Sequence, residues 1–370
     1  MITQDSFPVE PWQVRETQLD LELLAQSESV FALSNGHIGF RGNLDEGEPH
    51  GLPGTYLNSF YETRPLPYAE SGFGYPQGGE TIVDVTNGKI IRLLVDDEPF
   101  DVRYGELIDH ERILDLRAGT LSRTVHWRSP AGKQVRVKST RLVSLAQRSV
   151  AAIEYTVEAI DEFARVTVQS ELVANEDQPK TSSDPRVAAA LANPLQAIHH
   201  EHNQHSGLLI HQTKRSGLMM AAAMDHEIEV PGRVEVSTDA RPDLARTTVI
   251  CGLRPGQQLR IVKYLAYGWS SLRSRPALRD QVAGALAGAH YSGWQGLLDL
   301  QRAYLDDFWD SADVEVDGDP DCQQAVRFGL FHVLQASARA ECRGIAGKGL
   351  TGTGYDGHSF WDTEGFVLPV

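Results

Sequence analysis

Short stretches of alternating apolar and polar residues fill the first 268 positions of the chain and predict β-strands. The clearest is Gln134-Val-Arg-Val-Lys-Ser139, in which the two valines face one way and the polar side chains face the other. It is preceded by a strand-like run at 121–128 and by the turn residues Ser129-Pro-Ala-Gly132. Together these pieces predict a β-hairpin over residues 121–142.

A second hairpin is expected where residues 81–85 and 89–95 flank the pair Asn87-Gly88. Asn-Gly suits the positive φ angles of a type I′ turn. More strand-like runs follow at residues 150–157, 164–172, 208–211, 217–224, 233–236, 247–251 and 258–267. More than ten strands in about 260 residues predict a large antiparallel β-sandwich.

The polar stretch 175–207 interrupts these strands and contains His199, His200, His202 and His205. Histidines can ligate zinc, so a metal site is one interpretation. Neither a cysteine nor a ligand-like spacing accompanies them. We therefore expect a solvated loop between strands.

The pattern changes to a helical one at Gly268. Residues 276–290 are rich in helix formers, and residues 291–310 repeat apolar side chains about every 3.6 positions. A further helix is expected to start at a cap formed by Asp319 or Asp321 and to end near residue 340. Its broad apolar face, which must be buried against another part of the protein, comprises Ala325, Phe328, Leu330, Phe331 and Leu334.

Three parts follow from this reading. We expect an N-terminal β-sandwich domain at residues 1–268, a helical linker at 269–313 and the start of a helical domain at 314–370. About fifty residues are too few for a domain of typical size, so the helical domain is expected to be incomplete.

Composition narrows the class of protein. A hydrophobic content of 41% and a charged content of 23% are typical of a soluble globular protein. The formal net charge of −16 argues against nucleic acid or an anionic membrane as partner. The three cysteines are too few and too far apart for a disulfide framework or a zinc cluster. With neither a signal peptide nor an apolar run of about 20 residues in sight, we expect a cytoplasmic protein.

The densest candidate chemistry lies in the motif Gly347-Lys-Gly-Leu-Thr-Gly-Thr-Gly-Tyr-Asp-Gly-His-Ser-Phe-Trp-Asp-Thr-Glu364. Its glycines let the backbone bend and approach other groups closely. An aromatic ring stacks on the C–H face of a sugar, and a neighbouring carboxylate accepts hydrogen bonds from its hydroxyls. Trp361 and Asp362 are therefore predicted to bind a sugar, with Phe360 and His358 as weaker candidates. The glycines would form the rim of that pocket.

Three other interpretations of the motif are weaker. Gly352-Thr-Gly-Tyr-Asp-Gly357 matches the dinucleotide fingerprint, but the preceding strand and the βαβ unit that this fingerprint requires are absent. His358, Asp362 and Glu364 do not form a clean set of metal ligands, so we expect no metal. Asp362 and Glu364 stand at positions i and i+2, which would point to different sides of a helix and so disfavour a catalytic carboxylate pair.

The run from Lys348 to Glu364 resembles the signature of glycoside hydrolase family 65, which contains maltose, trehalose and kojibiose phosphorylases and related trehalases. Phe31-Ala-Leu-Ser-Asn-Gly-His-Ile-Gly-Phe-Arg-Gly42 and Gly54-Thr-Tyr-Leu-Asn-Ser-Phe-Tyr-Glu62 are similar to the N-terminal part of that family. The resemblance covers nearly the whole chain. Tyr355-Asp-Gly-His358 and Thr363-Glu-Gly-Phe366 look most like trehalase-type members from actinobacteria.

The resemblance implies a β-sandwich, a helical linker and the truncated start of an (α/α)6 barrel. It implies that Trp361 and Asp362 bind the non-reducing glucose. It also implies an inverting reaction whose general acid is a glutamate farther along the barrel, so that no catalytic residue lies in these 370 residues. No cofactor is implied, although phosphorolysis would use inorganic phosphate as co-substrate.

We therefore expect the N-terminal part of an enzyme that acts on an α-glucosidic disaccharide, trehalose first and then maltose or kojibiose. The chain alone is expected to be inactive. The alternative is a carbohydrate-binding or assembly fragment in which the sandwich mediates homodimerisation.

Overall fold

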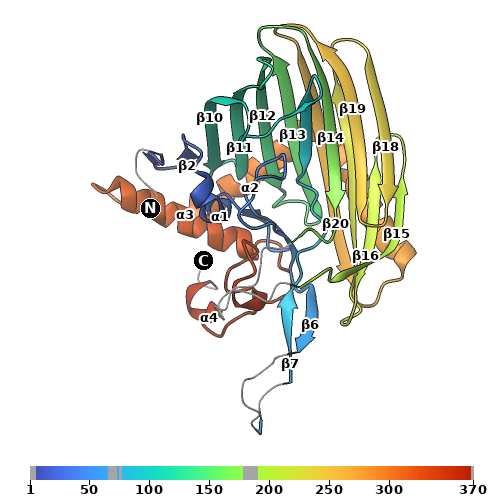
Figure 1. Ribbon diagram of the computed structural model, residues 1–370. Coiled ribbons are helices and arrows are strands. Elements are labelled where there is room, and N and C mark those ends of the chain that lie inside the picture. The colour runs from blue at the N-terminus through green and yellow to red at the C-terminus, as the bar shows by residue number, and fades with distance from the viewer. Residues whose placement is uncertain (1–5, 66–72, 75–76, 178–190, 368–370) are drawn as a thin grey trace.

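Two antiparallel β-sheets stacked face to face make up most of the computed structural model, which describes residues 6–65, 73–74, 77–177 and 191–367 (Figure 1). In these residues the larger sheet has ten strands and the smaller has five. In spatial order the larger sheet consists of β1 (Val9–Glu10), β2 (Gln13–Glu16), β10 (Glu106–Asp115), β11 (Thr120–Arg128), β12 (Gln134–Val143), β13 (Val150–Ala159), β20 (Gln258–Ser270), β17 (Met219–Glu229), β16 (Gly207–Thr213) and β15 (Leu195–His202).

The smaller sheet closes the sandwich from the other side. In spatial order it consists of β18 (Val234–Arg241), β19 (Leu244–Leu253), β14 (Ala164–Val173), β8 (Ile91–Val95) and β9 (Glu98–Pro99). Two short antiparallel sheets complete the strands, one of β3 (Leu33–Ser34), β4 (Ile38–Phe40) and β5 (Thr55–Leu57), and one of β6 (Tyr61–Pro65) and β7 (Gly78–Ile82). The prediction of a large antiparallel sandwich is confirmed.

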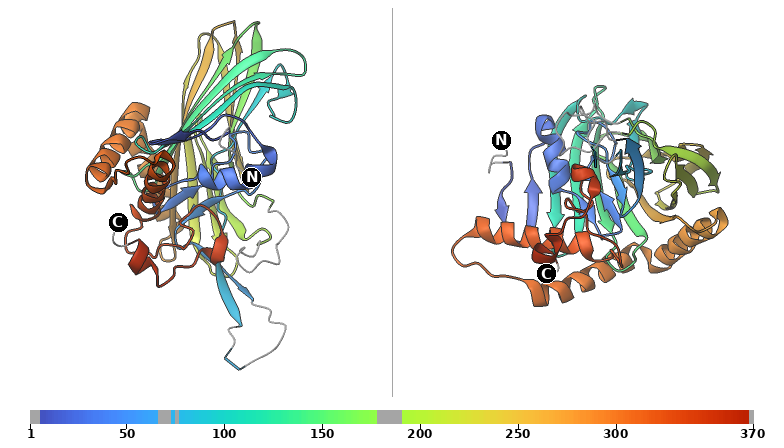
Figure 2. Two further views of the ribbon diagram at one scale, coloured as in Figure 1. Left: turned by 90° about the vertical axis from the view of Figure 1, so that its left-hand side faces the viewer. Right: turned by 90° about the horizontal axis from the view of Figure 1, so that it is seen from below.

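The helical elements are few, and two of them are long. They are α1 (Leu24–Val30), α2 (Arg275–Ala312), α3 (Pro320–Ser337) and α4 (Thr363–Phe366), with single 3₁₀ turns η1 (Leu21–Leu23) and η2 (Gly354–Gly357). Figure 2 shows α2 and α3 lying together against one side of the sheets. Among the described residues, no helix is long and apolar enough to cross a membrane.

Around β13, β20 and β17 both faces of the large sheet are buried, and the period of two along a strand divides its side chains between two cores. On β13, Ala151 and Ile153 face the smaller sheet, whereas Val150 and Ala152 lie in the core beneath α2. On α2 that second core receives Leu278, Val282 and other apolar side chains. A helix therefore covers the large sheet where it would otherwise meet water.

The hairpin predicted over residues 121–142 is confirmed. β11 and β12 pair from Thr120↔Leu142 to Arg128↔Gln134, and Gly132 in the turn has φ +94°. Val135 and Val137 are buried and their polar neighbours point away from the core, as the alternation required.

The hairpin predicted across Asn87-Gly88 is wrong. β7 pairs with β6 and β8 pairs with β14, while Asn87 forms a bridge to Val173, more than eighty positions away. Gly88 is needed for space rather than for a turn, because a Cβ there would lie 2.5 Å from the Tyr267 hydroxyl. A distant strand therefore outcompeted the local turn signal.

The loop predicted for residues 175–207 is also wrong in part. Residues 178–190 lie outside the described ranges, but Leu195–His202 is strand β15, which pairs with β16 at the edge of the large sheet. The polar side chains concealed this strand because much of an edge strand meets water. Within the described ranges no three His, Cys, Asp or Glu residues are grouped to hold a metal ion.

The helices begin and end close to their predicted positions. α2 contains a break at Gly293, whose φ of 66° and ψ of 171° are not helical. Asp319 rather than Asp321 caps α3, because its Oδ1 accepts a hydrogen bond from the Cys322 N–H at 3.0 Å. Pro320 occupies the first turn, where a missing N–H costs nothing.

The apolar face of α3 packs on the N-terminal strands of the sandwich. Phe331 and Leu334 are buried, whereas Ala325, expected on the same face, is exposed. Gln335 joins α3 to β3 directly, since its Oε1 accepts a hydrogen bond from the Ser34 N–H at 2.9 Å. Trp12, Trp269, Trp294 and Trp309 pack in or against the cores. The division at residues 268 and 313 and the barrel start stay predictions.

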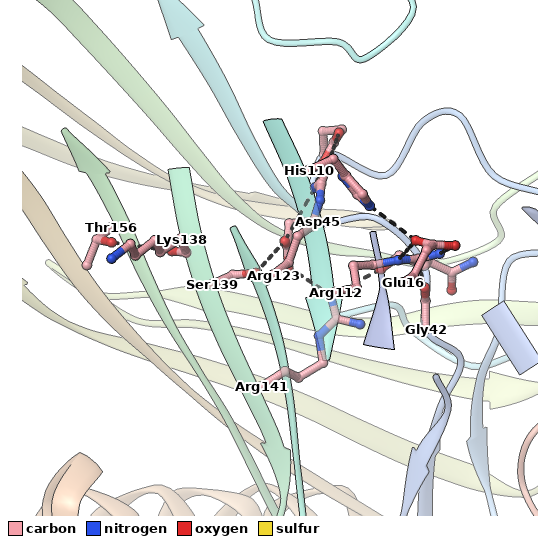
Figure 3. Close-up of polar contacts among 12 residues, drawn as sticks. Glu16, Gly42, Asp45, His110, Arg112, Arg123, Lys138, Ser139, Arg141 and Thr156 are labelled. Carbon is pink, nitrogen blue, oxygen red and sulfur yellow. Dashed lines mark hydrogen bonds and ion pairs between the residues drawn. The ribbon is translucent and has the colours of Figure 1, made fainter. Parts of the chain in front are cut away.

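Ion pairs are buried between the N-terminal segment and strands β10 to β12 (Figure 3). The Arg112 guanidinium donates to both oxygens of Glu16, at 2.6 and 2.9 Å. Arg141 donates to Asp45 at 2.8 Å, and the Ser139 hydroxyl donates to the other Asp45 oxygen at 2.6 Å. Burying such charges is tolerable only because each carboxylate has a cation and further hydrogen bonds.

These environments shift the ionisation of the buried groups. Although burial opposes it, hydrogen bonding to His110 and the charge of Arg112 lower the pKa of Glu16 to about 2. Burial lowers the pKa of His110 to about 4 and the pKa of His226 to about 3. The folded protein therefore keeps these histidines neutral at a pH where the unfolded chain protonates them.

Lowering the pH from 7 to 5 should reduce the free energy of unfolding. An unfolded histidine takes up its proton near pH 6.5, so each buried neutral histidine should cost about 1.4 kcal/mol per pH unit below that value. The depressed pKa of Glu16 adds a loss of the same sign between about pH 4.5 and 2. Urea unfolding at pH 7, 6 and 5 measures the effect, and His226→Gln should make the decline shallower.

An unfolding free energy that stays level from pH 7 to pH 5 would contradict this account. The slope of the free energy against urea is the control. It should stay constant over the range, because a change would mean that acid had altered the compactness of the unfolded chain.

Candidate functional site

The segment of residues 344–362, here called the motif loop, lies against the short sheet β3–β5. Gly39 on β4 makes this contact possible, because a Cβ there would lie 2.2 Å from the Cβ of Leu350 and 2.3 Å from its carbonyl oxygen. Leu350 is buried in a small cluster with Tyr56 and Ile82. The glycine on the strand and the leucine on the loop therefore fit each other.

The Arg41 side chain binds the backbone of the motif loop. Its Nη1 donates to the Thr351 carbonyl at 2.6 Å, and its Nη2 donates to the Ala25 carbonyl at 2.7 Å. The Glu28 carboxylate lies 3.5 Å from the same guanidinium and balances its charge. The loop is thus fixed by a buried cation whose own position is fixed by α1.

Asn58 makes a second link. Its Nδ2 donates to the Gly36 carbonyl at 2.8 Å and to the Gly344 carbonyl at 3.1 Å. Gly39 and Arg41 belong to the run 31–42, and Asn58 belongs to the run 54–62. These two runs, which the sequence singled out far from the motif, are the ones that hold it.

The glycine run itself forms the 3₁₀ turn η2 and is not a phosphate-binding loop at a helix start. Tyr355 and Asp356 both have φ of 56°, and Gly357 follows with φ of 74°. The Tyr355 ring packs edge-on against Phe360, with ring centroids 5.3 Å apart. The Lys348 Nζ lies 5.7 Å from the centre of the Tyr355 ring.

A cavity of about 360 Å³ opens beside these rings. This volume lies within the roughly 300–1,000 Å³ typical of small-molecule sites. Its lining combines aromatic rings, one carboxylate, a hydroxyl and glycine backbone, contributed by Ile345, Ala346, Gly347, Tyr355, Phe360, Asp362, Thr363 and Val367. A neighbouring cavity of about 260 Å³ shares part of this wall and reaches His332 on α3.

The structure brings two of the four predicted sugar-binding residues to this cavity. Asp362 and Phe360 line it, and the Asp362 side chain makes no capping hydrogen bond to α4. Trp361 is 89% exposed and is not part of the lining. His358 faces elsewhere, since its Nε2 donates to the Glu80 carbonyl at 2.7 Å. Nothing is described of the Glu364 side chain.

Sequence reasoning missed Tyr355, Thr363 and Ile345 as lining residues. Tyr355 stood between glycines, and its place beside Phe360 depends on a left-handed backbone that no local pattern announced. Thr363 directly follows Asp362, so the end of the motif carried a signal for it. The aromatic rings and the Asp362 carboxylate of this cavity can bind a polyol. Among the described residues, no second carboxylate lines the cavity.

Comparisons with known proteins agree with this reading of the fold. The profile of the glycosyl hydrolase family 65 N-terminal domain matches residues 14–308, and that of the family 65 central catalytic domain matches residues 327–370. An uncharacterized glycosyl hydrolase of Mycobacterium tuberculosis is 82% identical over 370 residues, which cover 100% of this chain and 47% of the relative. The α,α-trehalose phosphorylase of Thermoanaerobacter brockii is 33% identical over 98% of this chain and 48% of its own length.

A solved structure shares the fold. It is a human-microbiome protein provisionally assigned as a kojibiose phosphorylase, with a TM-score of 0.86 and 23% identity over 98% of this chain and 47% of that chain. The chain thus spans about half the length of the relatives it matches.

Gly39→Ala should detach the motif loop from β4. The added methyl group would collide with the Leu350 backbone, which cannot rotate away, so we expect the free energy of unfolding to fall by about 1–3 kcal/mol. Amide hydrogen exchange over residues 347–352 should become faster. Urea unfolding and exchange measured by mass spectrometry test both effects.

Gly284→Ala on α2 is the matched control. Nothing lies within 4 Å of a Cβ at that position, so the helix should gain up to about 1 kcal/mol and the loop exchange should not change. Unaltered exchange at 347–352 in Gly39→Ala would show that β4 does not hold the loop.

Proposed function

The chain belongs to glycosyl hydrolase family 65, and we propose that the whole protein cleaves an α-glucosidic disaccharide with inversion at the anomeric carbon. The observation that supports this most directly is the cavity at the motif loop, where the Asp362 carboxylate stands beside the Phe360 and Tyr355 rings. Rings that pack on C–H faces and a carboxylate that accepts from hydroxyls are what a glucose unit requires.

In this proposal Asp362 accepts hydrogen bonds from the hydroxyls of the non-reducing glucose and fixes its orientation. Trp361 presents an exposed indole next to Asp362 and stacks on the sugar from outside the cavity. Phe360 forms part of the wall, whereas His358 supports the loop through the Glu80 carbonyl. These are orienting roles, which lower the entropic part of the barrier.

The bond cleavage itself needs a general acid that protonates the glycosidic oxygen while a nucleophile attacks from the opposite face. Asp362 is the one carboxylate among the described residues that line the cavity. We infer that the acid is a glutamate in the part of the relatives that these residues do not cover. The nucleophile is phosphate in a phosphorylase and water in a hydrolase.

Trehalose is the first candidate substrate, with maltose and kojibiose next. The 33% identity to the α,α-trehalose phosphorylase of Thermoanaerobacter brockii supports this order. Rates measured with the full-length protein on each disaccharide, with and without inorganic phosphate, test both the substrate and the reaction. No turnover of any of the three under either condition would overturn the enzyme proposal.

Asp362→Asn in the full-length protein should weaken the binding of trehalose by about 10- to 100-fold. This range corresponds to the roughly 1.5–3 kcal/mol of a hydrogen bond to a charged group. Calorimetric titration gives the dissociation constant. Asp317→Asn is the matched control, because Asp317 is exposed in the turn before α3 and does not line the cavity. Equal affinities for Asp362→Asn and the unaltered protein would remove Asp362 from the site.

Residues 1–370 alone should bind sugar without cleaving it, which is the carbohydrate-binding alternative applied to this half of the protein. Incubation with trehalose and phosphate, followed by a glucose assay, should show no product above the blank. Sedimentation of the same sample would tell whether the sandwich mediates homodimerisation. Measurable cleavage would refute the inference that the general acid lies elsewhere.

A further inference from the structure

The turn at the centre of the motif loop has a backbone that its sequence disfavours. Tyr355, Asp356 and Gly357 have φ of 56°, 56° and 74° in succession. Only glycine adopts this left-handed region freely, and a tyrosine there costs on the order of 1–2 kcal/mol. Such residues persist only when surrounding contacts hold them, so the contacts of this turn carry information.

The contacts come from the β6–β7 ribbon, which projects from the sandwich beside the motif loop (Figure 1). The Arg64 Nη2 donates to the Asp356 Oδ2 at 2.8 Å, and the Tyr61 hydroxyl donates to the Gly357 carbonyl at 2.6 Å. Ile82 packs so closely against Gly357 that a Cβ added to the glycine would lie 2.7 Å from the Ile82 Cβ. The turn is therefore held by an ion pair, a hydrogen bond and an apolar contact.

The ribbon is itself fixed to the large sheet. The buried Glu62 carboxylate accepts hydrogen bonds from the backbone N–H groups of Arg215 and Ser216, at 2.9 and 2.8 Å. The Ser216 hydroxyl donates to the Tyr61 carbonyl at 2.7 Å. The base of the ribbon is thus a rigid support and not a free arm.

Two contacts connect the turn to the residues that line the cavity. The Tyr355 ring, next to Asp356, lies against Phe360, and both line the cavity with Asp362. The Gly347 N–H donates to the His358 carbonyl at 2.9 Å and ties the two ends of the glycine run together. A shift of Asp356 therefore moves the ring wall that faces the Asp362 carboxylate.

We propose that the β6–β7 ribbon is the positioning element of this sugar site, with Arg64 and Tyr61 as positioning residues that act through Asp356 and Gly357. This inference rests on the proposed function, since it names what holds the glucose-binding residues in place. The Arg64 and Asp356 side chains are 22% and 17% exposed, so their separation need not unfold the protein.

The test uses the full-length protein and compares Arg64→Ala with Arg136→Ala. Arg136 also forms a partly exposed ion pair within the sandwich, with Glu158 at 3.1 Å, but it has no contact with the motif loop. Arg64→Ala should weaken trehalose binding on the order of tenfold, the effect of a small misplacement in a binding site. It should also speed amide exchange over residues 354–362, while Arg136→Ala changes neither quantity.

Two further variants separate positioning from general stability. Tyr61→Phe removes a single hydroxyl from the ribbon and should give the same two effects to a smaller extent. Arg64→Lys keeps the charge and should recover part of the affinity. The melting temperatures of Arg64→Ala and Arg136→Ala should be similar, so that a difference in affinity cannot come from stability alone.

The outcomes distinguish this inference from the proposed function. Unchanged exchange at 354–362 in Arg64→Ala, or unchanged affinity despite faster exchange, would overturn the positioning role. If the unaltered protein binds neither trehalose, maltose nor kojibiose, the proposed function is what fails. The exchange measurement still decides in that case whether the ribbon holds the turn.

Discussion

Pairing of buried carboxylates with arginines is the interaction on which the rest of this structure depends. Removing a charge from water without a partner costs several kcal/mol. The carboxylates of the N-terminal segment can therefore be buried in the sandwich only where they contact cationic side chains. Arg112 meets Glu16 and Arg141 meets Asp45 with two-point or hydroxyl-supported contacts. These pairs fix the register of the segment against strands β10 to β12 more strictly than apolar packing would, because a shift by one residue would separate every pair.

The same device reaches the candidate site. Arg41 is paired with Glu28, whose carboxylate in turn accepts the N–H groups of Gly51 and Leu52, at 2.9 Å each. From that position Arg41 donates to the Thr351 carbonyl in the motif loop. The ion pair of Arg41 with Glu28 thereby fixes the position of a loop more than three hundred residues later in the chain. The run 31–42 thus supports the motif loop, although it contributes no side chain to the cavity of about 360 Å³.

Local patterns predicted the elements whose partners are adjacent in sequence. The β11–β12 hairpin follows from alternation and a turn, and α3 follows from its cap and its apolar spacing. The partner of Asn87 could not be found locally, because Val173 ends strand β14, more than eighty positions later in the chain. β15 was missed because its polar composition is typical of a loop, whereas its histidines and glutamate are partly exposed at a sheet edge. In the site, Asp362 and Phe360 were identifiable from the motif, but Tyr355 was not, because contacts with β6–β7 decide its conformation.

The exposure of Trp361 acquires a meaning from this arrangement. Arg41, Asn58 and the β6–β7 ribbon hold the motif loop from the sandwich side, whereas the indole beyond Phe360 is 89% exposed. An ordered backbone beneath an uncovered aromatic ring is what preorganised binding requires, because the ordering entropy is spent on folding and not on ligand capture. The sandwich therefore does more than lie beside the proposed sugar site. It supplies the rigid floor on which the motif can present a ring and a carboxylate in a fixed relation.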